Sequence, residues 1–492
     1  MALSETHIRN IFIYTLPKFV SYGLHLITLP ILTRILTPED FGVITLSMAF
    51  PTIIVGIVTA GFTNSVPRYF FEYRKDRRKL NALYFSIQLY LFLMLIASTA
   101  FVYLTKDYLS SLVTGKTDYG FAVLIAYIAI YLGQINLVYL RIYQNMEKAV
   151  QHSSFVILQA VTSVAMSLLL VWYFRLSYMG MLYGSFIGAL VACITMFVCF
   201  NKQVYVDFSR KVLLENIKYG LQVVPKSFTG FINRFFDKYM LNAMLSMSVV
   251  GIYNIGQTIA HAFEVLMNNV WMSFQPLSYR DVFDRGEKAS SDVGRIFTIF
   301  SYITLFPVIL GILFAQEIIY IIAPASYYGA GNVIVILAAG VMTQTFGMFV
   351  SVQYAYTKRP FWIFPITVIG TVFNVAANIY LIPRYGLIGA AFATMVSTTI
   401  VNALLTYIGQ KLYKIQYEWG TIASLYALIM TAMVSVLYFR TMDYGNIYLY
   451  PLKLIFIILF ALIGIKARII TKKSVEKVYG ALFKFPQTRE GL

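Results

Sequence analysis

The stretch IFIYTLPKFVSYGLHLITLPIL (residues 11–32) is an apolar run that contains a lysine behind a proline, Pro17-Lys18. The same pair, Pro225-Lys226, recurs in NIKYGLQVVPKSFTGFI (residues 216–232). A charged side chain at the centre of a bilayer costs roughly 2.5–3.5 kcal/mol even on the lowest insertion scales, so each lysine requires compensation. The two pairs therefore predict either a buried structural partner in each half or the passage of an anionic substrate.

The composition is typical of a membrane protein. Of the 492 residues, 59% are hydrophobic and 12% are charged, whereas a soluble domain has about 25% charged residues. The net charge of +18 lies mainly in short segments between apolar runs, which indicates membrane topology and does not predict a nucleic-acid partner. Residues 1–10 are too short and too polar for a signal peptide, so the first apolar run is expected to be retained as a span.

Fourteen segments reach the length of about 20 mainly apolar residues that a membrane-spanning helix needs. Their approximate bounds are 11–33, 41–65, 81–104, 120–142, 152–174, 178–200, 214–236, 248–274, 296–319, 330–355, 361–383, 388–410, 419–439 and 448–467. The predicted fold is thus an all-α integral membrane protein with fourteen transmembrane helices. Cys193 and Cys199 lie six positions apart, on different faces of one helix, and are expected to be packing residues without a disulfide or a metal.

The basic residues predict the orientation of these spans. With the N-terminus inside, cytoplasmic segments hold 28 of the 39 Lys and Arg, the opposite loops hold 8, and 3 (Lys18, Lys226 and Lys453) fall within spans. This bias predicts that both termini are cytoplasmic. The basic tail is expected to lie on the anionic inner surface.

An internal repeat relates the two halves of the chain. At a shift of 208, Pro17-Lys18 falls on Pro225-Lys226, and at a shift of 209 Gly42 falls on Gly251. The other markers at 209 are Pro67 with Pro276, Arg175 with Arg384, and Gly180 with Gly389. Each copy has six spans. Because six is an even number, both copies face the same way, and they are expected to form two parallel lobes around a central cavity.

The repeat also predicts the domain boundaries. These are 1–200 for the N-lobe, 201–213 for a cytoplasmic linker that acts as a hinge, 214–410 for the C-lobe, 411–467 for two additional spans, and 468–492 for the tail.

The turn after the first span has a recognisable pattern, R-x-L-x-P-x-[DE]-[FY]-G, and the next span ends in Arg68-Tyr69. The pattern residues are Arg34, Leu36, Pro38, Asp40, Phe41 and Gly42. Together with SVVGIYNIGQTIA (248–260) and RYGLIGAAFAT (384–394), this turn resembles the polysaccharide-export (Wzx-like) flippases of the multidrug/oligosaccharidyl-lipid/polysaccharide exporter superfamily. The resemblance covers nearly the whole chain, and it implies that the protein lies in the cytoplasmic (inner) membrane of a bacterium or an archaeon.

The resemblance implies a flippase that moves an undecaprenyl-diphosphate-linked oligosaccharide from the cytoplasmic to the outer leaflet by alternating access. The product would enter O-antigen, capsule or exopolysaccharide assembly, with a polymerase and chain-length machinery as partners beside the substrate and membrane lipids. No cofactor is expected, and a proton or sodium gradient is the candidate driving force.

Two relatives within the superfamily stay open as alternatives, a peptidoglycan-precursor flippase and an ion-coupled multidrug exporter. A membrane glycosyltransferase or polymerase is less favoured, because the longest predicted outer loop runs only from Thr105 to Tyr119. The sequence has no nucleotide-binding loop, metal-ligand cluster or nucleophile elbow. The sequence therefore predicts that the protein is not an enzyme and not an ATPase.

A doubly anionic diphosphate headgroup would need cationic and polar groups along its path, and ionisable residues within spans are the candidates. Lys18 shares a helix face with His25, and Lys226 shares one with Asn233 and Asp237. The alternative for each lysine is a structural ion pair. Arg68, at the cytoplasmic end of its span, is a candidate cavity residue or a snorkelling anchor.

The eighth span carries polar residues at steps of three and four, which places them on one face. They are Tyr253, Gln257, His261, Glu264 and Asn268. Gln257 and His261 are predicted to line the cavity, and Glu264 is predicted either to pair with Lys226 or to couple transport to an ion. Asp237 has the same two candidate roles, with Arg234 as its local partner, and Asn374 and Asn378 are expected to be polar packing residues.

Overall fold

The computed structural model describes residues 5–201, 204–440 and 445–470, and within these ranges the chain is helical almost throughout and has no strand. The helices up to the predicted linker are α1 (Glu5–Ile35), α2 (Pro38–Val58), α3 (Phe62–Tyr73), α4 (Arg77–Thr114), α5 (Gly120–Asn145), α6 (Ala149–Leu168) with a π turn (Leu169–Tyr173), and α7 (Ser177–Asn201).

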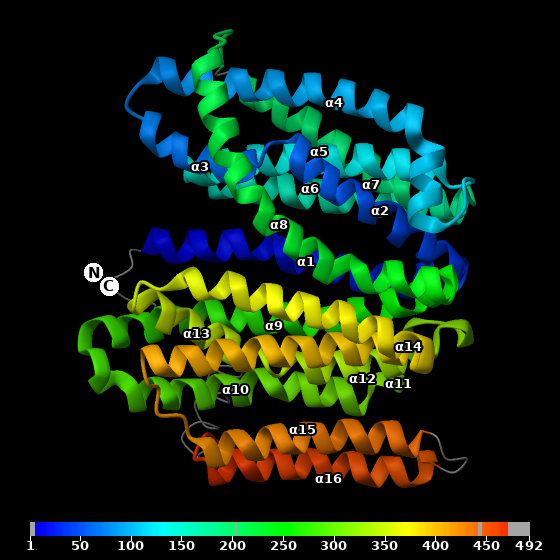
Figure 1. The fold of residues 1–492 in the computed structure, drawn as a ribbon, viewed down its shortest axis with the longest axis vertical. Helices are drawn as coiled ribbons and strands as arrows, with labels where there is room; N and C mark the ends of the chain where they lie inside the picture. Colours follow the sequence, from blue (N-terminus) through cyan, green and yellow to red (C-terminus); the bar gives the residue numbers. More distant parts are fainter. Residues whose placement is uncertain (1–4, 202–203, 441–444, 471–492) are drawn as a thin grey trace, which may run out of the picture. The chain divides into compact units, whose positions relative to one another are not determined.

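The helices after the linker complete the set (Figure 1). They are α8 (Arg210–Met244), α9 (Met247–Arg285), α10 (Ser290–Leu313), α11 (Ala315–Ile322), α12 (Ala330–Val341), α13 (Gln344–Tyr356), α14 (Ile363–Leu412), α15 (Trp419–Phe439) and α16 (Gly445–Lys466). Short 3-10 turns lie at Gly286–Ala289, Ala325–Tyr327 and Pro360–Trp362.

Each of the fourteen predicted spans is covered by one helix or by two consecutive helical segments of this set. Ten helical stretches of the described chain are long and apolar enough to cross a membrane. Two of the ten, Met247–Leu313 and Pro360–Leu412, each cover two predicted spans, so the ten stretches account for twelve of the fourteen. The other two are the lysine-bearing spans, which lie in α1 and α8. The predicted all-α membrane fold is confirmed.

Several spans are interrupted where the sequence predicts continuous helices. The second span breaks between α2 and α3, where Gly61 adopts a φ of +64°. Conversely, most of the loop predicted from Thr105 to Tyr119 is helical, because α4 continues to Thr114 and ends at Gly115, whose φ of +79° closes the helix. The outer loop at this point is therefore even shorter than predicted.

The chain divides into two compact units. Unit 1 comprises Met1–Ile255, Ile319–Gly329 and Val375–Ala390, and unit 2 comprises Gly256–Ile318, Ala330–Asn374 and Ala391–Leu492. In unit 1, α5 packs against α2, α4 and α7, and α6 lies between α1 and α7 (Figure 1). The predicted lobe boundaries stay a prediction.

Two buried polar side chains inside unit 1 donate to backbone carbonyls of neighbouring helices. The Tyr131 hydroxyl donates to the Leu91 carbonyl at 3.0 Å, and the Asn136 amide donates to the Ala189 carbonyl at 2.9 Å. Such bonds hold neighbouring helices together in a medium that has no water to replace them.

In unit 2, the two additional C-terminal helices, α15 and α16, lie side by side and contact α10 (Figure 1). Lys453 of α16 is buried and forms an ion pair with Glu317 of α11. The lysine of the unrepeated spans therefore has a structural partner.

The structure reproduces the internal repeat at the level of the backbone. Ser177 and Gly386, which are 209 residues apart, both have a positive φ, of 49° and 58°, in the turn before the last helix of each repeat. The hydroxyls of Thr37 and Ser246, also 209 apart, accept hydrogen bonds from backbone N–H groups at the start of α2 and of α9. Equivalent positions thus have equivalent backbone roles in the two copies.

The repeated glycines pack reciprocally. A Cβ on Gly42 would lie 2.1 Å from the Met247 carbonyl oxygen, and a Cβ on Gly251 would lie 1.9 Å from the Pro38 carbonyl oxygen. The start of α2 and the start of α9 therefore approach so closely that their backbones are in contact, as small residues permit in membrane helices.

Replacing Gly42 by alanine is expected to lower the free energy of unfolding by about 1–3 kcal/mol, the usual cost of overpacking a tight contact. Gly56→Ala on the same helix is the matched control, because a Cβ there would meet no atom within 4 Å. The measurement is thermal or denaturant unfolding of the two purified variants in detergent. Equal stability of the two variants would contradict the close approach.

Candidate functional site

The two repeated lysines lie in the backbone of α1 and α8, but the side chains of Lys18, Lys226 and Asn233 are outside the described residues. Their predicted cavity roles stay predictions. His25, one helical face along from Lys18, is exposed, and its Nδ1 lies 2.9 Å from the Ser21 carbonyl oxygen of its own helix.

Asp237 lies at the centre of a buried polar cluster in unit 1. Its side chain is 1% exposed. The Tyr253 hydroxyl of α9 donates to Oδ2 at 3.2 Å, and the Asn378 amide of α14 donates to Oδ1 at 2.7 Å. The local partner expected in the sequence, Arg234, has a side chain outside the described residues, so that pairing stays a prediction.

The next residue along α8 is also buried. Lys238 is 5% exposed, and its ammonium group donates to the Asn254 side chain at 2.9 Å and lies 5.4 Å from the centre of the Phe235 ring. Lys238 lies just beyond the predicted seventh span (214–236), and no role was predicted for Asn254. The polar pair Tyr253-Asn254 inside an apolar run was the signal that could have located this cluster.

The polar face predicted on α9 is divided between two environments. Tyr253 is buried beside Asp237, whereas His261 and Glu264 bond to each other, with Nδ1 and Oε2 2.9 Å apart and side-chain exposures of 49% and 33%. Gln257 is partly buried, and the Asn268 amide donates to the Glu264 carbonyl. Glu264 thus has a partner on its own helix, His261, in place of the predicted Lys226.

Arg68 on α3 is exposed and stacks on aromatic rings. Its guanidinium carbon lies 4.4 Å from the centre of the Tyr219 ring on α8 and 5.5 Å from that of Tyr69. The Tyr73 hydroxyl donates to the Glu215 carboxylate of α8 at 2.8 Å. Arg68 therefore lies on an aromatic surface that joins α3 to α8. This geometry is suited either to a snorkelling anchor or to a cation that binds a ligand.

The turn with the family-like pattern has a structural role. Asp40 accepts a hydrogen bond from the Thr37 backbone in a capping box at the start of α2, and its other oxygen accepts one from the Ser177 hydroxyl at 2.5 Å. The Tyr327 hydroxyl donates to the Leu36 carbonyl at 2.7 Å. The Thr33 hydroxyl donates to the Ile322 carbonyl at 2.6 Å.

These contacts connect the first half of the chain to segments of the second half within unit 1. The turns that they join all lie at the ends that the charge bias predicts to face outward. The arrangement holds this end together with backbone and hydroxyl groups. Among the described residues, no group of three or more His, Cys, Asp or Glu could hold a metal ion.

Comparison with known proteins gives a family match and a curated relative. Residues 7–279 match the family described as Polysaccharide biosynthesis protein. A probable low-salt glycan biosynthesis flippase, Agl15, from Haloferax volcanii is 26% identical over 215 residues, which cover 42% of this chain and 45% of that protein. The chain thus matches less than half the length of this curated relative.

Two solved structures have the same fold. The lipid II flippase MurJ in an inward closed conformation superposes with a TM-score of 0.69 at 14% identity, covering 96% of this chain and 100% of that one. An inward-facing multidrug resistance MATE family transporter of the MOP superfamily gives a TM-score of 0.65 at 15% identity, covering 85% and 98%. Since the family match extends over more than half of the sequence, the chain belongs to the Polysaccharide biosynthesis protein family and has the fold of MOP-superfamily transporters.

Proposed function

We propose that this protein is a flippase that moves an undecaprenyl-diphosphate-linked oligosaccharide from the cytoplasmic to the outer leaflet for surface polysaccharide assembly. The family match over residues 7–279 is the observation that carries the proposal. A flippase of glycan biosynthesis among the relatives and a lipid II flippase among the structures with the same fold support it.

The contacts within unit 1 support an alternating-access mechanism. Alternating access requires two arrangements of the lobes, each closed on one side of the membrane. At the end predicted to face outward, the Leu36 carbonyl of the first half accepts a hydrogen bond from Tyr327 of the second half. Gly42 of the first half lies against the Met247 backbone of the second half. These contacts would break when the outer side opens and would re-form when it closes.

Asp237 is the residue that we propose for coupling to a proton or sodium gradient. A carboxylate that is 1% exposed can exchange a proton or a cation with a large change in its electrostatic energy. Its hydrogen bonds from Tyr253 and Asn378 connect α8 to α9 and α14, so a change in its charge would alter the packing of three helices. Glu264 is more exposed and already bonds to His261.

The first experiment tests the repeated lysines. Lys18→Ala together with Lys226→Ala is expected to reduce translocation of a lipid-diphosphate-linked oligosaccharide by about tenfold or more, because each charge-assisted bond to a phosphate contributes about 1.5–3 kcal/mol. Translocation is measured in proteoliposomes as the decrease in the fraction of oligosaccharide headgroups that a lectin outside the vesicles can bind. Lys358→Ala, an exposed lysine in a predicted cytoplasmic loop, is the control.

Normal translocation by the double variant, at equal insertion, would exclude the lysines as diphosphate ligands. Translocation of cationic drugs in the same vesicles, without translocation of the glycolipid, would replace the proposal with the multidrug-exporter alternative.

The second experiment tests coupling. Asp237→Asn preserves the shape of the side chain and removes its charge, so the stimulation of translocation by an imposed proton or sodium gradient is expected to fall about tenfold, within the range of ordinary coupling free energies. Glu264→Gln is the matched control and should keep the stimulation. Both are measured in the same proteoliposome assay, after thermal unfolding has shown that each variant is folded.

If Glu264→Gln loses the gradient dependence and Asp237→Asn keeps it, Glu264 is the coupling residue. Retention by both variants would mean that neither carboxylate couples transport to the gradient.

A further inference from the structure

A cavity of about 530 Å³ lies in unit 1 where the start of α4 meets the ends of α5 and α7. Its apolar wall includes Leu80, Met146, Phe200 and Val204, and Arg77 is the cation that lines it. The volume is within the usual range for small-molecule sites, about 300–1,000 Å³. The predicted topology places this cavity at the cytoplasmic boundary of the membrane.

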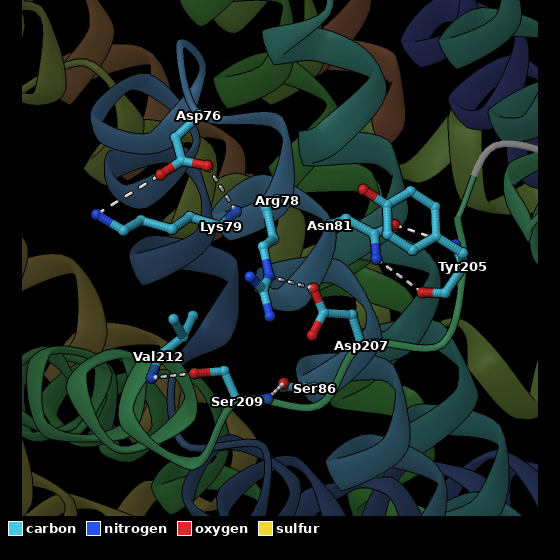
Figure 2. A network of polar contacts seen from close by, with 9 residues as sticks. All are labelled: Asp76, Arg78, Lys79, Asn81, Ser86, Tyr205, Asp207, Ser209 and Val212. Carbon is cyan, nitrogen blue, oxygen red and sulfur yellow. Dashed lines mark hydrogen bonds and ion pairs between the residues drawn. The ribbon is translucent and has the colours of Figure 1, made fainter.

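Val204 and Tyr205 of the predicted inter-lobe linker form one side of the cavity. Figure 2 shows the polar contacts that fix residues 205–209 to α4. The Asn81 amide donates to the Tyr205 carbonyl at 2.7 Å and accepts from the Tyr205 N–H at 3.0 Å. The Ser209 N–H donates to the Ser86 hydroxyl at 2.9 Å. Three backbone groups of the linker are thus bonded to α4 side chains, so the cavity has a defined wall.

The Arg77 side chain lines the cavity without an ion-pair partner, whereas the next two basic residues each have one. Arg78 lies 4.0 Å from Asp207 of the linker, and Lys79 lies 3.7 Å from Asp76 (Figure 2). The Lys79 backbone N–H bonds to Asp76 and lowers the pKa of that carboxyl, so it stays ionised. Among the described residues, Arg77 forms no ion pair, hydrogen bond or ring contact.

An unpaired guanidinium at the rim of an apolar cavity is suited to a ligand with an anionic head and a hydrocarbon body. Guanidinium binds phosphate oxygens in a bidentate manner. Anionic lipids are concentrated in the cytoplasmic leaflet, and basic pockets between helices on that side bind their headgroups. A free phosphate would use Arg77 but leave the apolar wall without a partner.

We propose that this cavity binds an anionic phospholipid of the inner leaflet, with its phosphodiester on Arg77 and part of an acyl chain against Met146, Phe200 and Val204. In this proposal the bound phospholipid is not the transported substrate. Because Val204 and Tyr205 belong to the linker, a bound lipid would contact both α4 and the linker and would hold the linker in its observed position.

The test is native mass spectrometry of the full-length protein in detergent, titrated with phosphatidylglycerol or phosphatidylcholine. One phosphatidylglycerol is expected to remain bound at concentrations at which phosphatidylcholine does not. Arg77→Gln is expected to weaken this binding about fivefold, the effect of one basic residue near an anionic surface. Lys75→Gln removes the same charge from an exposed neighbour outside the cavity and should leave the affinity unchanged.

A second variant separates the cavity from the basic surface around it. Met146→Trp fills the apolar wall without changing the charge, so it should weaken phosphatidylglycerol binding as much as Arg77→Gln does. Equal binding of the two lipids, equal loss in Arg77→Gln and Lys75→Gln, or unchanged binding in Met146→Trp would each overturn the proposal. Full displacement of the bound lipid by millimolar inorganic phosphate alone would overturn it too, by showing that the apolar wall is not used.

Discussion

The close approach of two backbones at Gly42 and Gly251 is the constraint on which the end of unit 1 predicted to face outward depends. With the carbonyls of Met247 and Pro38 at these distances, neither glycine position has room for a Cβ. The tight approach also explains why the turn before Gly42 needs its own hydrogen bonds. Asp40 closes the start of α2 and binds Ser177, so the helix is correctly aimed before it meets α9.

The buried lysines of the described residues have structural partners. Lys453 is neutralised by Glu317, and Lys238 donates to Asn254, which leaves these lysines with structural partners. A buried ion pair adds little to stability, since desolvation offsets the attraction between the charges. Their cost is nevertheless lower than that of an isolated charge in hydrocarbon. Structural partners therefore account for Lys238 and Lys453, which are the buried lysines of the described residues.

The sequence predicted the helices well because membrane spans are long apolar segments whose length is set by the bilayer. It also predicted the repeat, since equivalent positions such as Ser177 and Gly386 need the same unusual backbone. It did not predict the partners of Asp237, because Asn378 lies 141 residues away and only tertiary packing brings them together. Helix breaks such as that at Gly61 were also missed, because a single glycine in an apolar run leaves the hydropathy of that run unchanged.

The attachment of the linker to α4 limits where the lobes can bend. A hinge at residues 204–209 would have to break the bonds of Asn81 and Ser86 to the linker. The first turns of α8 are held too, since a Cβ on Gly61 would lie 2.5 Å from the Gly220 carbonyl oxygen and Tyr73 binds Glu215. The next weak point along α8 is Pro225, which lacks the N–H that a continuous helix would use. We therefore expect the bend that the proposed alternating access would require to lie at the Pro-Lys pair itself, where a change in helix direction would also move the lysine.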